Sequence, residues 1–432
     1  MGKHAFAAWG AYDRDHPYPV FADARERGAV HPVTLADGHA AWLVVRYDEA
    51  RAALNDPRFS KDLRAALARS GDVVAEGLPG PEFARHMLVV DPPDHTRLRR
   101  LVSAAFSVRR VESLRPRVQA MVDELLDAIA AQGSDATVDL VAAFAFPLPY
   151  TVICDLLGVP EPDRGRLGRA LTDMHAPTTS PDEFAHAKAA SDVVVAMLQA
   201  LVEMKQRAPG DDLVTALIAA RDGDERLDQR ELLSTILQLI IAGHDTTASL
   251  IGNSVVALLE HPEQLAQLRA DLDAIPAALE ELLRYDAPVP HSTFRYATEP
   301  VELGGATIPA GGQVIISLGA ANRDEHRYDG SEALELDRAD VHHLAFGHGI
   351  HFCLGAALAR MEGQIALRSL LERFPQLRLA GAPDDLHWHH GDGLVLRGLR
   401  ELLVVAGPAR PREEPPGGRL ITPRGRARRE PV

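Results

Sequence analysis

The strongest local signal in the sequence is the stretch FGHGIHFCLGAALARME, residues Phe346–Glu362. Gly347 and Gly349 permit backbone angles that other residues resist, so a tight loop can present Cys353 with backbone N–H groups pointing towards its sulfur. The small residues after Cys353 indicate the start of a helix. We expect the positive end of this helix to lower the pKa of the thiol and to keep it ionised as a ligand. Gly355 would let a flat group approach closely.

Two other interpretations of Cys353 remain open at this point. A single cysteine can be a small buried hydrophobic side chain, which is how we interpret Cys154 in YTVICDLLGVP. Alternatively, a tract rich in Cys and His can bind zinc, and four histidines precede Cys353 closely: His342, His343, His348 and His351. A structural zinc site prefers several thiolates, and it would not need the glycines.

The loop resembles that of a known family. Phe346, Gly349, Cys353 and Gly355 stand in the F-x-x-G-x-x-x-C-x-G pattern of the haem-thiolate monooxygenases, the cytochrome P450 family. The resemblance implies that Cys353 is the axial iron ligand of haem b and that His351 fills the usual basic position before it. It also implies that Phe346, Gly347 and Gly355 contact the haem.

Further motifs support this resemblance. EELLR places Glu281 and Arg284 three residues apart on one helix face, where they can form an ion pair. In order and spacing it is similar to the family's E-x-x-R motif, a structural lock beneath the haem. The segment Ala321–Arg338 resembles the family's approach to the Cys loop and supplies Arg323 and Arg338.

The segment DPPDHTRLRRLV predicts a helix that begins at Asp91 or just after it, with the prolines in its first turn. His95 and Arg99 are four residues apart and share a face of that helix. The resemblance implies that they hold a haem propionate, with Arg295 of TFRYA as a third cation. Together with His351, these charges would neutralise two buried carboxylates.

A long apolar helix is predicted around LIIAGHDTTASLI, residues 239–251. Asp228 can cap its start, with Glu231 three residues later, and the chain leaves the helix before His261 and Pro262. The helix would have about 33 residues and span roughly 50 Å, enough to cross the molecule.

The polar residues inside this helix match the family pattern A-G-x-[DE]-T-T. The resemblance places Ala242 over the distal face of the haem, where oxygen binds. It implies that Asp245 and Thr246 form the acid–alcohol pair that delivers protons. We expect the glycine and a threonine hydroxyl to bend or open the helix locally.

The resemblance covers nearly the whole chain and implies a mainly α fold with small β-sheets and a long central helix over the haem. We expect one domain over residues 1–407 and a disordered Pro-, Gly- and Arg-rich tail over residues 408–432. Helical periodicity is clear at Val111–Gln132, Ala187–Gln206 and Pro262–Tyr285.

Composition restricts the location and partners of the protein. A formal net charge of -15 argues against a general nucleic-acid binder. We find neither the apolar core of a signal peptide nor an uncharged apolar stretch of the roughly 18 residues that a membrane span needs. We therefore expect a cytoplasmic protein without a membrane anchor, and a monomer.

The resemblance implies a monooxygenase that uses O₂ to hydroxylate, or epoxidise, an apolar small molecule. Electrons would come from NAD(P)H through a separate ferredoxin and its reductase, because the chain is too short and too poor in cysteine for a fused flavin or iron–sulfur module. Candidate docking residues are basic: Arg97, Arg100, Arg109, Arg110 and Arg360. A non-catalytic haem-thiolate sensor would not need Asp245 and Thr246, so this pair counts against that alternative.

The sequence encodes little about the substrate. The chain looks most similar to actinomycete-type members that tailor polyketide macrolides, and a steroid or terpenoid hydroxylase is the alternative. The candidate pocket residues are mostly apolar or small, which fits a bulky hydrophobic ligand. They are Phe83, Met87, Leu88, Val89, Ala242, Val289, His291, Thr293, Leu394 and Val395.

Overall fold

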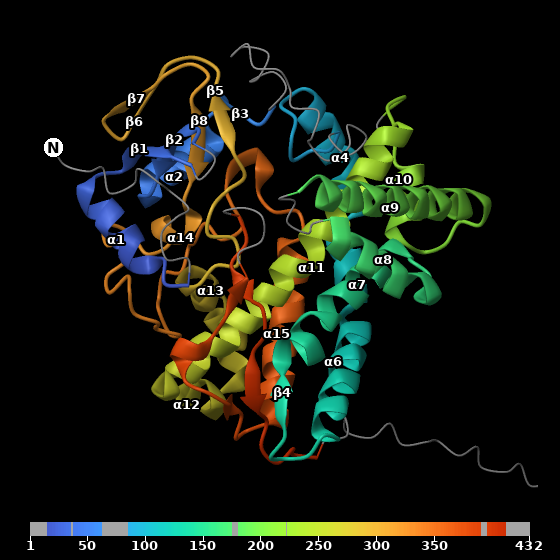
Figure 1. Ribbon diagram of the computed structural model, residues 1–432, viewed down its shortest axis with the longest axis vertical. Helices are drawn as coiled ribbons and strands as arrows, with labels where there is room; N and C mark the ends of the chain where they lie inside the picture. The colour runs from blue at the N-terminus through green and yellow to red at the C-terminus, as the bar shows by residue number, and fades with distance from the viewer. Residues whose placement is uncertain are drawn as a thin grey trace, which may run out of the picture.

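The computed structural model describes residues 15–35, 38–62, 85–174, 180–221, 223–389 and 395–411. Helices dominate and short strands form small sheets, which confirms the predicted fold class (Figure 1). The helices are α1 (Tyr18–Arg27), α2 (Tyr47–Asn55), α4 (Asp94–Ala105), α5 (Val108–Ser113), α6 (Arg115–Ala130), the π-helix η2 (Val141–Ala145), α7 (Pro147–Leu157), α8 (Glu161–Met174), α9 (Pro181–Arg207), α10 (Leu213–Ala219), α11 (Gln229–Glu260), α12 (Pro262–Ala270), α13 (Ile275–Tyr285), α14 (Leu318–Ala321) and α15 (Ala356–Arg373), with short 3₁₀ turns η3 (Leu272–Ala274), η4 (Gly349–His351) and η5 (Pro383–Asp385).

In the described part of the chain, the strands form four small sheets. They are β1 (Val30–Thr34), β2 (Ala40–Val44), β3 (Phe59–Ser60), β4 (Thr137–Asp139), β5 (Arg295–Ala297), β6 (Val301–Leu303), β7 (Ala306–Ile308), β8 (Gln313–Ile316), β9 (Arg378–Leu379), β10 (Trp388–His389), β11 (Gly398–Leu399) and β12 (Leu403–Val405). The largest sheet has the order β1-β2-β8-β5-β3, and its β2–β8 pair is parallel with Leu43 opposite Ile315. This sheet lies beside α1, α2 and α14, while the other sheets are β4-β12-β9, β10-β11 and β6-β7 (Figure 1).

Helix α11 crosses the middle of the molecule, between α7 and α15 (Figure 1). Asp228 caps it: the Asp228 carboxylate accepts from the Glu231 N–H at 2.8 Å, and the Glu231 carboxylate accepts from the Asp228 N–H at 3.0 Å. His261 ends it and Pro262 begins α12. The predicted bounds are therefore confirmed. Neighbouring helices bury most sides of α11, which explains why its sequence is apolar all round.

Helix α4 begins at Asp94 and not at Asp91, so its predicted start was too early. Asp91 instead bonds to the chain around β3, where its carboxylate accepts from the Lys61 N–H at 2.9 Å and from the Ser60 hydroxyl. Pro92 and Pro93 therefore precede the first turn. The helix still carries His95 towards the centre of the molecule, because this side chain is 3% exposed.

Within the described part of the chain, α9 has the length and hydropathy of a membrane span, with a mean hydropathy of 1.2. The bent pair of η2–α7 and α8 passes the same test only when taken together. Helix α9 buries one face, including Val194, Leu198 and Val202, against α8, α10 and α11. This is the pattern of an amphipathic helix on a protein core.

The predicted tail is described only as far as residue 411. Its Arg410 N–H donates to the Arg373 carbonyl at 2.9 Å, so the first tail residues lie against the end of α15. Residues 412–432 lie outside the described part of the chain. The predicted domain boundary at residue 407 stays a prediction.

Candidate functional site

The residues that the motifs predicted to act together line one cavity of about 490 Å³. It is lined by α11 on one wall and by the Cys353 loop with the start of α15 on another, while α4 and β5 contribute basic side chains. The predicted residues on its walls are Cys353, Phe346, Gly347, Gly355, His351, His95, Arg99, Arg295, Ala242, Asp245 and Thr246. The structure therefore brings together segments that are far apart in the sequence.

The Cys353 loop is held by its own backbone and by α2. The Cys353 N–H donates to the Phe346 carbonyl at 2.9 Å. Gly347 and Gly349 both adopt φ of 73°, a left-handed conformation that favours glycine. A Cβ atom on Gly349 would lie 3.0 Å from the carbonyl oxygen of Leu54, near the end of α2. The loop thus needs glycine here for its conformation and for its close contact with α2.

The Cys353 sulfur faces the cavity, but the chain alone does not ionise it. Burial raises the pKa of the Cys353 thiol, although the Gly355 and Ala356 N–H groups, Arg99 and Arg360 act in the opposite direction. The predicted lowering of this pKa was therefore wrong, because desolvation outweighs the helix end. A metal ion bonded to the sulfur would supply the missing positive charge and deprotonate the thiol.

Buried basic groups crowd together in the cavity wall. The rings of His95 and His351 lie 4.4 Å apart between centroids. Burial, with the nearby charges of Arg295, His95 and Lys61, lowers the pKa of His351 to about 2. Burial and Arg295 lower the pKa of Lys61 to about 7, against the attraction of Asp91. Lys61 had not been predicted from the sequence, because no motif includes it.

This basic group is electrostatically incomplete. Nε2 of His95 and Nε of Arg295 are buried and have no hydrogen-bond partner among the described residues. Asp91 is the carboxylate that favours the charged forms of Lys61, His95 and Arg295. Buried donors without partners are costly, so the arrangement calls for an anionic ligand. The two propionates of haem b have this chemistry, and the Cys353 sulfur on the same cavity fits its iron.

The distal wall is a continuous helix. The Thr246 hydroxyl donates to the Ala242 carbonyl at 2.8 Å, and α11 keeps its α-helical form through this turn. The expected opening is therefore not seen, because the hydroxyl adds a bond to a carbonyl within the helix without breaking its α-helical form. The expected bend stays a prediction. Gly243 has another role: a Cβ atom there would lie 3.1 Å from Ile153 of α7. Glycine thus lets α7 pack closely against α11.

Glu281 and Arg284 form a buried ion pair outside the cavity lining. Both side chains are 0% exposed, and Nε of Arg284 lies 2.6 Å from Oε2 of Glu281. The remaining guanidinium N–H groups donate to the carbonyls of Asn322, Ser331 and Ala333 and to Oε1 of Glu281. Arg338 adds a second cation 3.3 Å from Glu281. The pair therefore joins α13 to the segment that leads to the Cys353 loop.

The predicted substrate residues divide into three groups. Those that line the cavity are Met87, Leu88, Ala242, Val289, Thr293 and Val395. Val89 and His291 do not: His291 is fully buried and packs edge-on against Phe21 at 5.5 Å. Phe83 and Leu394 lie outside the described residues.

Several polar residues of the cavity were missed by the sequence analysis. Besides Lys61, they include Gln238 of α11 and Glu362 of α15. Burial raises the pKa of Glu362 to about 8, and its Oε2 has no hydrogen-bond partner in the described part of the chain. Gln238 precedes the recognised motif by one helical turn, and this spacing could have identified it.

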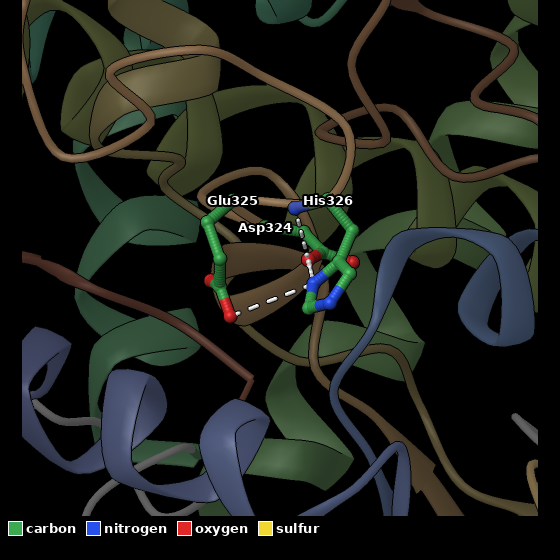
Figure 2. A group of neighbouring side chains, drawn as sticks. All are labelled: Asp324, Glu325 and His326. Atoms are coloured by element: carbon green, nitrogen blue, oxygen red, sulfur yellow. Dashed lines mark hydrogen bonds and ion pairs between the residues drawn. The ribbon is translucent and has the colours of Figure 1, made fainter.

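The zinc alternative gains no support from the described residues. His342 bonds to Asp340 at 2.5 Å and His343 lies 3.2 Å from Glu280, so these rings do not converge on Cys353. The described side chains that do converge as metal-type ligands are Asp324, Glu325 and His326, shown in Figure 2.

The Asp324 group has a structural role. The Asp324 carboxylate accepts from the N–H groups of Tyr47, at 2.8 Å, and His326, at 3.0 Å. Glu325 is bound by the buried Arg25 at 2.9 Å. These bonds join α1 and α2 to the segment after α14, so the acidic oxygens already have partners.

Most of the proposed docking arginines are engaged within the chain. Arg97 binds Glu231, Arg110 lies 3.2 Å from Asp211, and Arg360 lies 2.7 Å from Glu280. The Arg100–Glu225 contact is longer, at 3.8 Å, and both side chains are more than half exposed. Arg109 is exposed. Their predicted role in docking stays a prediction.

Comparisons with known proteins agree with the geometry of the cavity. A family model described as cytochrome P450 matches residues 171–397. Cytochrome P450 monooxygenase PikC of Streptomyces venezuelae is 46% identical over 389 residues, covering 90% of this chain and 90% of that protein. The 6-deoxyerythronolide B hydroxylase of Saccharopolyspora erythraea is 44% identical over 393 residues, covering 90% of this chain and 95% of that protein. The tirandamycin C-bound structure of the monooxygenase TamI has a TM-score of 0.79 at 42% identity, covering 90% of this chain and 97% of that chain.

Proposed function

Because the chain belongs to the cytochrome P450 family, we propose that it hydroxylates or epoxidises a macrolide or another bulky polyketide with electrons from a ferredoxin. As a monooxygenase of this family, it carries haem b on a cysteine thiolate and uses O₂, with NAD(P)H as the indirect electron source. The observation that carries the proposal is the single cavity with Cys353 on one wall and Asp245 and Thr246 on another.

Each group of residues has a distinct task in this proposal. Cys353 is the iron ligand, because Cys154, the other cysteine, is buried in the apolar contacts of α7. The residues that would hold the propionates are His95, Arg99, Arg295 and His351. Those that would contact the ring are Phe346, Gly347, Gly355 and Ala242. When bound, the haem would supply the activation of O₂, from which one oxygen atom enters the substrate and the other leaves as water.

Asp245 and Thr246 move protons into the cavity. Their side chains lie on α11 within the cavity lining, and the Asp245 carboxylate is 42% exposed. A half-exposed carboxyl can take a proton from solvent and pass it to the adjacent hydroxyl, which is general-acid catalysis. The Glu281–Arg284 pair takes no part in the chemistry and holds α13 against the chain before the Cys353 loop.

The substrate class follows from the cavity lining and from the relatives. Most of the described pocket side chains are apolar, including Met87, Leu88, Val289 and Val395, so a bulky hydrophobic molecule can bury its surface there. One relative is named for hydroxylation of 6-deoxyerythronolide B, and TamI binds tirandamycin C. We extend this class to the present chain, with a steroid as the alternative.

The remaining proposals concern partners and location. Arg100 and Arg109 are candidates to contact a ferredoxin because both are exposed, although Arg100 also lies 3.8 Å from Glu225. We propose that the protein is cytoplasmic and monomeric. Exchange of Arg100 and Arg109 for glutamate should slow reduction by ferredoxin, and unchanged reduction would remove them from the interface.

The test of the function is a spectral titration. The purified haem-loaded chain is titrated with 6-deoxyerythronolide B, tirandamycin C and a steroid while the haem absorption band is recorded. A shift with a polyketide, followed by an oxygenated product when ferredoxin and its reductase are added, supports the proposal. A shift and product with the steroid alone would overturn the substrate class. Cys353→Ser should lose the thiolate spectrum and Cys154→Ser should keep it, and the reverse would overturn the ligand assignment.

A further inference from the structure

His244 occupies the unspecified position of the A-G-x-[DE]-T-T motif, so the motif assigns it no role. Its side chain is only 8% exposed and lies where α7 packs against α11. The rings of Phe146 and Tyr150 meet the imidazole edge-on, with centroids 5.5 and 5.6 Å away. A polar ring among such neighbours needs a partner for each nitrogen.

Both ring nitrogens have an oxygen partner. Nδ1 lies 2.7 Å from the Ile240 carbonyl oxygen, and Nε2 lies 3.0 Å from Oδ1 of Asp245. A carbonyl oxygen can only accept, so Nδ1 carries a proton. In a neutral imidazole Nε2 is then an acceptor, and an ionised carboxylate is an acceptor too. Two acceptors cannot form a hydrogen bond, so one further proton lies between them.

We propose that His244 and Asp245 share this proton between Nε2 and Oδ1, and that His244 is a positioning residue that keeps Asp245 supplied with a proton to deliver. The inference rests on the proposed function, in which Asp245 is the acid. Transfer of the proton from Nε2 to Oδ1 converts an imidazolium and a carboxylate into a neutral imidazole and a carboxylic acid. The carboxylic acid of Asp245 then gives this proton up to the cavity, on the side of the Thr246 hydroxyl. A proton from solvent restores the shared proton between His244 and Asp245.

The electrostatic surroundings agree with a shared proton. Burial lowers the pKa of His244, but the hydrogen bond and charge of Asp245, together with the bond to the Ile240 carbonyl, outweigh burial, and the pKa is raised above its ordinary value. Tyr150 and Cys154 of α7 are the next titratable groups, and burial raises the pKa of both, that of Cys154 to about 11. Arg164 of α8 is bound to Asp155 at 2.5 Å. In the described part of the chain, the Asp245 carboxylate is therefore the charge that faces His244.

The first experiment measures stability against pH in the haem-loaded full chain. The variants are His244→Gln, Asp245→Asn and the double variant, and glutamine keeps a donor but cannot titrate. A raised pKa stabilises the fold below the unfolded pKa of histidine, and this stabilisation is lost as the pH rises through the folded value. The melting temperature of the wild type should therefore exceed that of His244→Gln by more at pH 6 than at pH 9. With Asn at 245, only the bond to the Ile240 carbonyl still opposes burial at His244. The difference in melting temperature between Asp245→Asn and the double variant at pH 6 should therefore be smaller than that between the wild type and His244→Gln, or reversed.

A matched control is present at the end of the same helix. Nδ1 of His261 also lies 2.7 Å from the carbonyl four residues earlier, and its ring meets Tyr285 edge-on, but it has no ion pair with a carboxylate among the described residues. His261→Gln therefore tests the loss of an imidazole without the loss of a shared proton. The same pH response in His261→Gln as in His244→Gln would overturn the inference.

The second experiment separates this inference from the proposed function. Oxygen consumption by the haem-loaded chain is measured from pH 6 to pH 9 with chemically reduced ferredoxin. Asp245→Asn should slow it at every pH, and an unchanged rate would overturn the role of Asp245 itself. The wild-type rate should fall at alkaline pH as the shared proton is lost, and His244→Gln should not show this fall. If Asp245→Asn is slow but His244→Gln keeps the wild-type profile, only the shared proton is overturned.

Discussion

Two buried arginines in this protein have opposite surroundings. Arg284 uses its five N–H groups on Glu281 and on three backbone carbonyls, so its charge is balanced within the chain. Arg295 makes one bond of 3.5 Å to the Phe59 carbonyl, and its Nε has no partner among the described residues. The first arginine is part of the scaffold. The second is incomplete until an anion binds, and this difference distinguishes a ligand site from a structural ion pair.

The largest effect should come from breaking the balanced pair. Glu281→Ala leaves the Arg284 charge buried without a carboxylate, so the free energy of unfolding should fall by about 3–5 kcal/mol. Denaturant unfolding of the haem-loaded protein measures this loss. Glu112 and Arg115 have the same spacing but lie half exposed. Glu112→Ala should cost far less, because solvent screens this pair, and similar losses at the two sites would contradict the comparison.

Removing a proton-transfer group should have the next largest effect. Thr246→Ala should reduce the product formed per O₂ consumed by about a hundredfold, because the hydroxyl next to Asp245 is lost. Thr246→Ser keeps the hydroxyl and should retain most of the yield. Melting temperatures of the two variants check that the fold is intact. Equal yields from Ala and Ser would show that the hydroxyl is not needed.

Removing an unbalanced charge should weaken haem binding without weakening the fold. Arg295→Gln should increase the rate of haem loss about tenfold, since one charge-assisted contact to a propionate disappears. The haem-free protein should be as stable as the wild type or more stable, because the repulsion within the basic group is reduced. Transfer of haem to an acceptor protein measures the rate. If haem-free Arg295→Gln were less stable than the haem-free wild type, Arg295 would be part of the scaffold, as Arg284 is.

Lys61 should give the smallest effect, and it depends on pH. In the fold its pKa is about 7, whereas an unfolded lysine keeps its proton to about pH 10. The unfolded state therefore binds more protons between these values, and folding stability rises with pH. The haem-free wild type should gain about 1 kcal/mol relative to Lys61→Met between pH 7 and pH 8. An equal response of the two proteins would contradict the shift in pKa.

The parts of the site that could be predicted are those with a local pattern. Cys353, Asp245 and the Glu281–Arg284 spacing can be found because a loop, a helix turn or a backbone bond fixes their neighbours within a few residues. Folding brings Lys61 into contact with Thr293 and Asp91, which are distant from it in the sequence. No periodicity in the sequence indicates such a contact. His291 shows the opposite error, since a residue in a predicted pocket segment points away from the cavity.

The fold shows the same division. The bounds of α11 followed from a capping box and a proline, which act locally. The periodic stretch Pro262–Tyr285 instead divides into α12 and α13, because Asp271 ends the first helix and accepts a bond from the Asp273 N–H. The start of α4 was misplaced because Asp91 bonds to a segment thirty residues earlier. Contacts distant in sequence override local preference in these cases.

The contact between Gly349 and α2 links the outer surface of the protein to its sulfur. Any side chain at 349 would collide with Asn55 and Leu54, so the Cys353 loop can lie against the end of α2 only with glycine at this position. Asn55 also lines a surface groove with Asp48 and Arg51. A larger residue at 349 would therefore shift the loop that holds the sulfur, although position 349 itself lies outside the cavity lining.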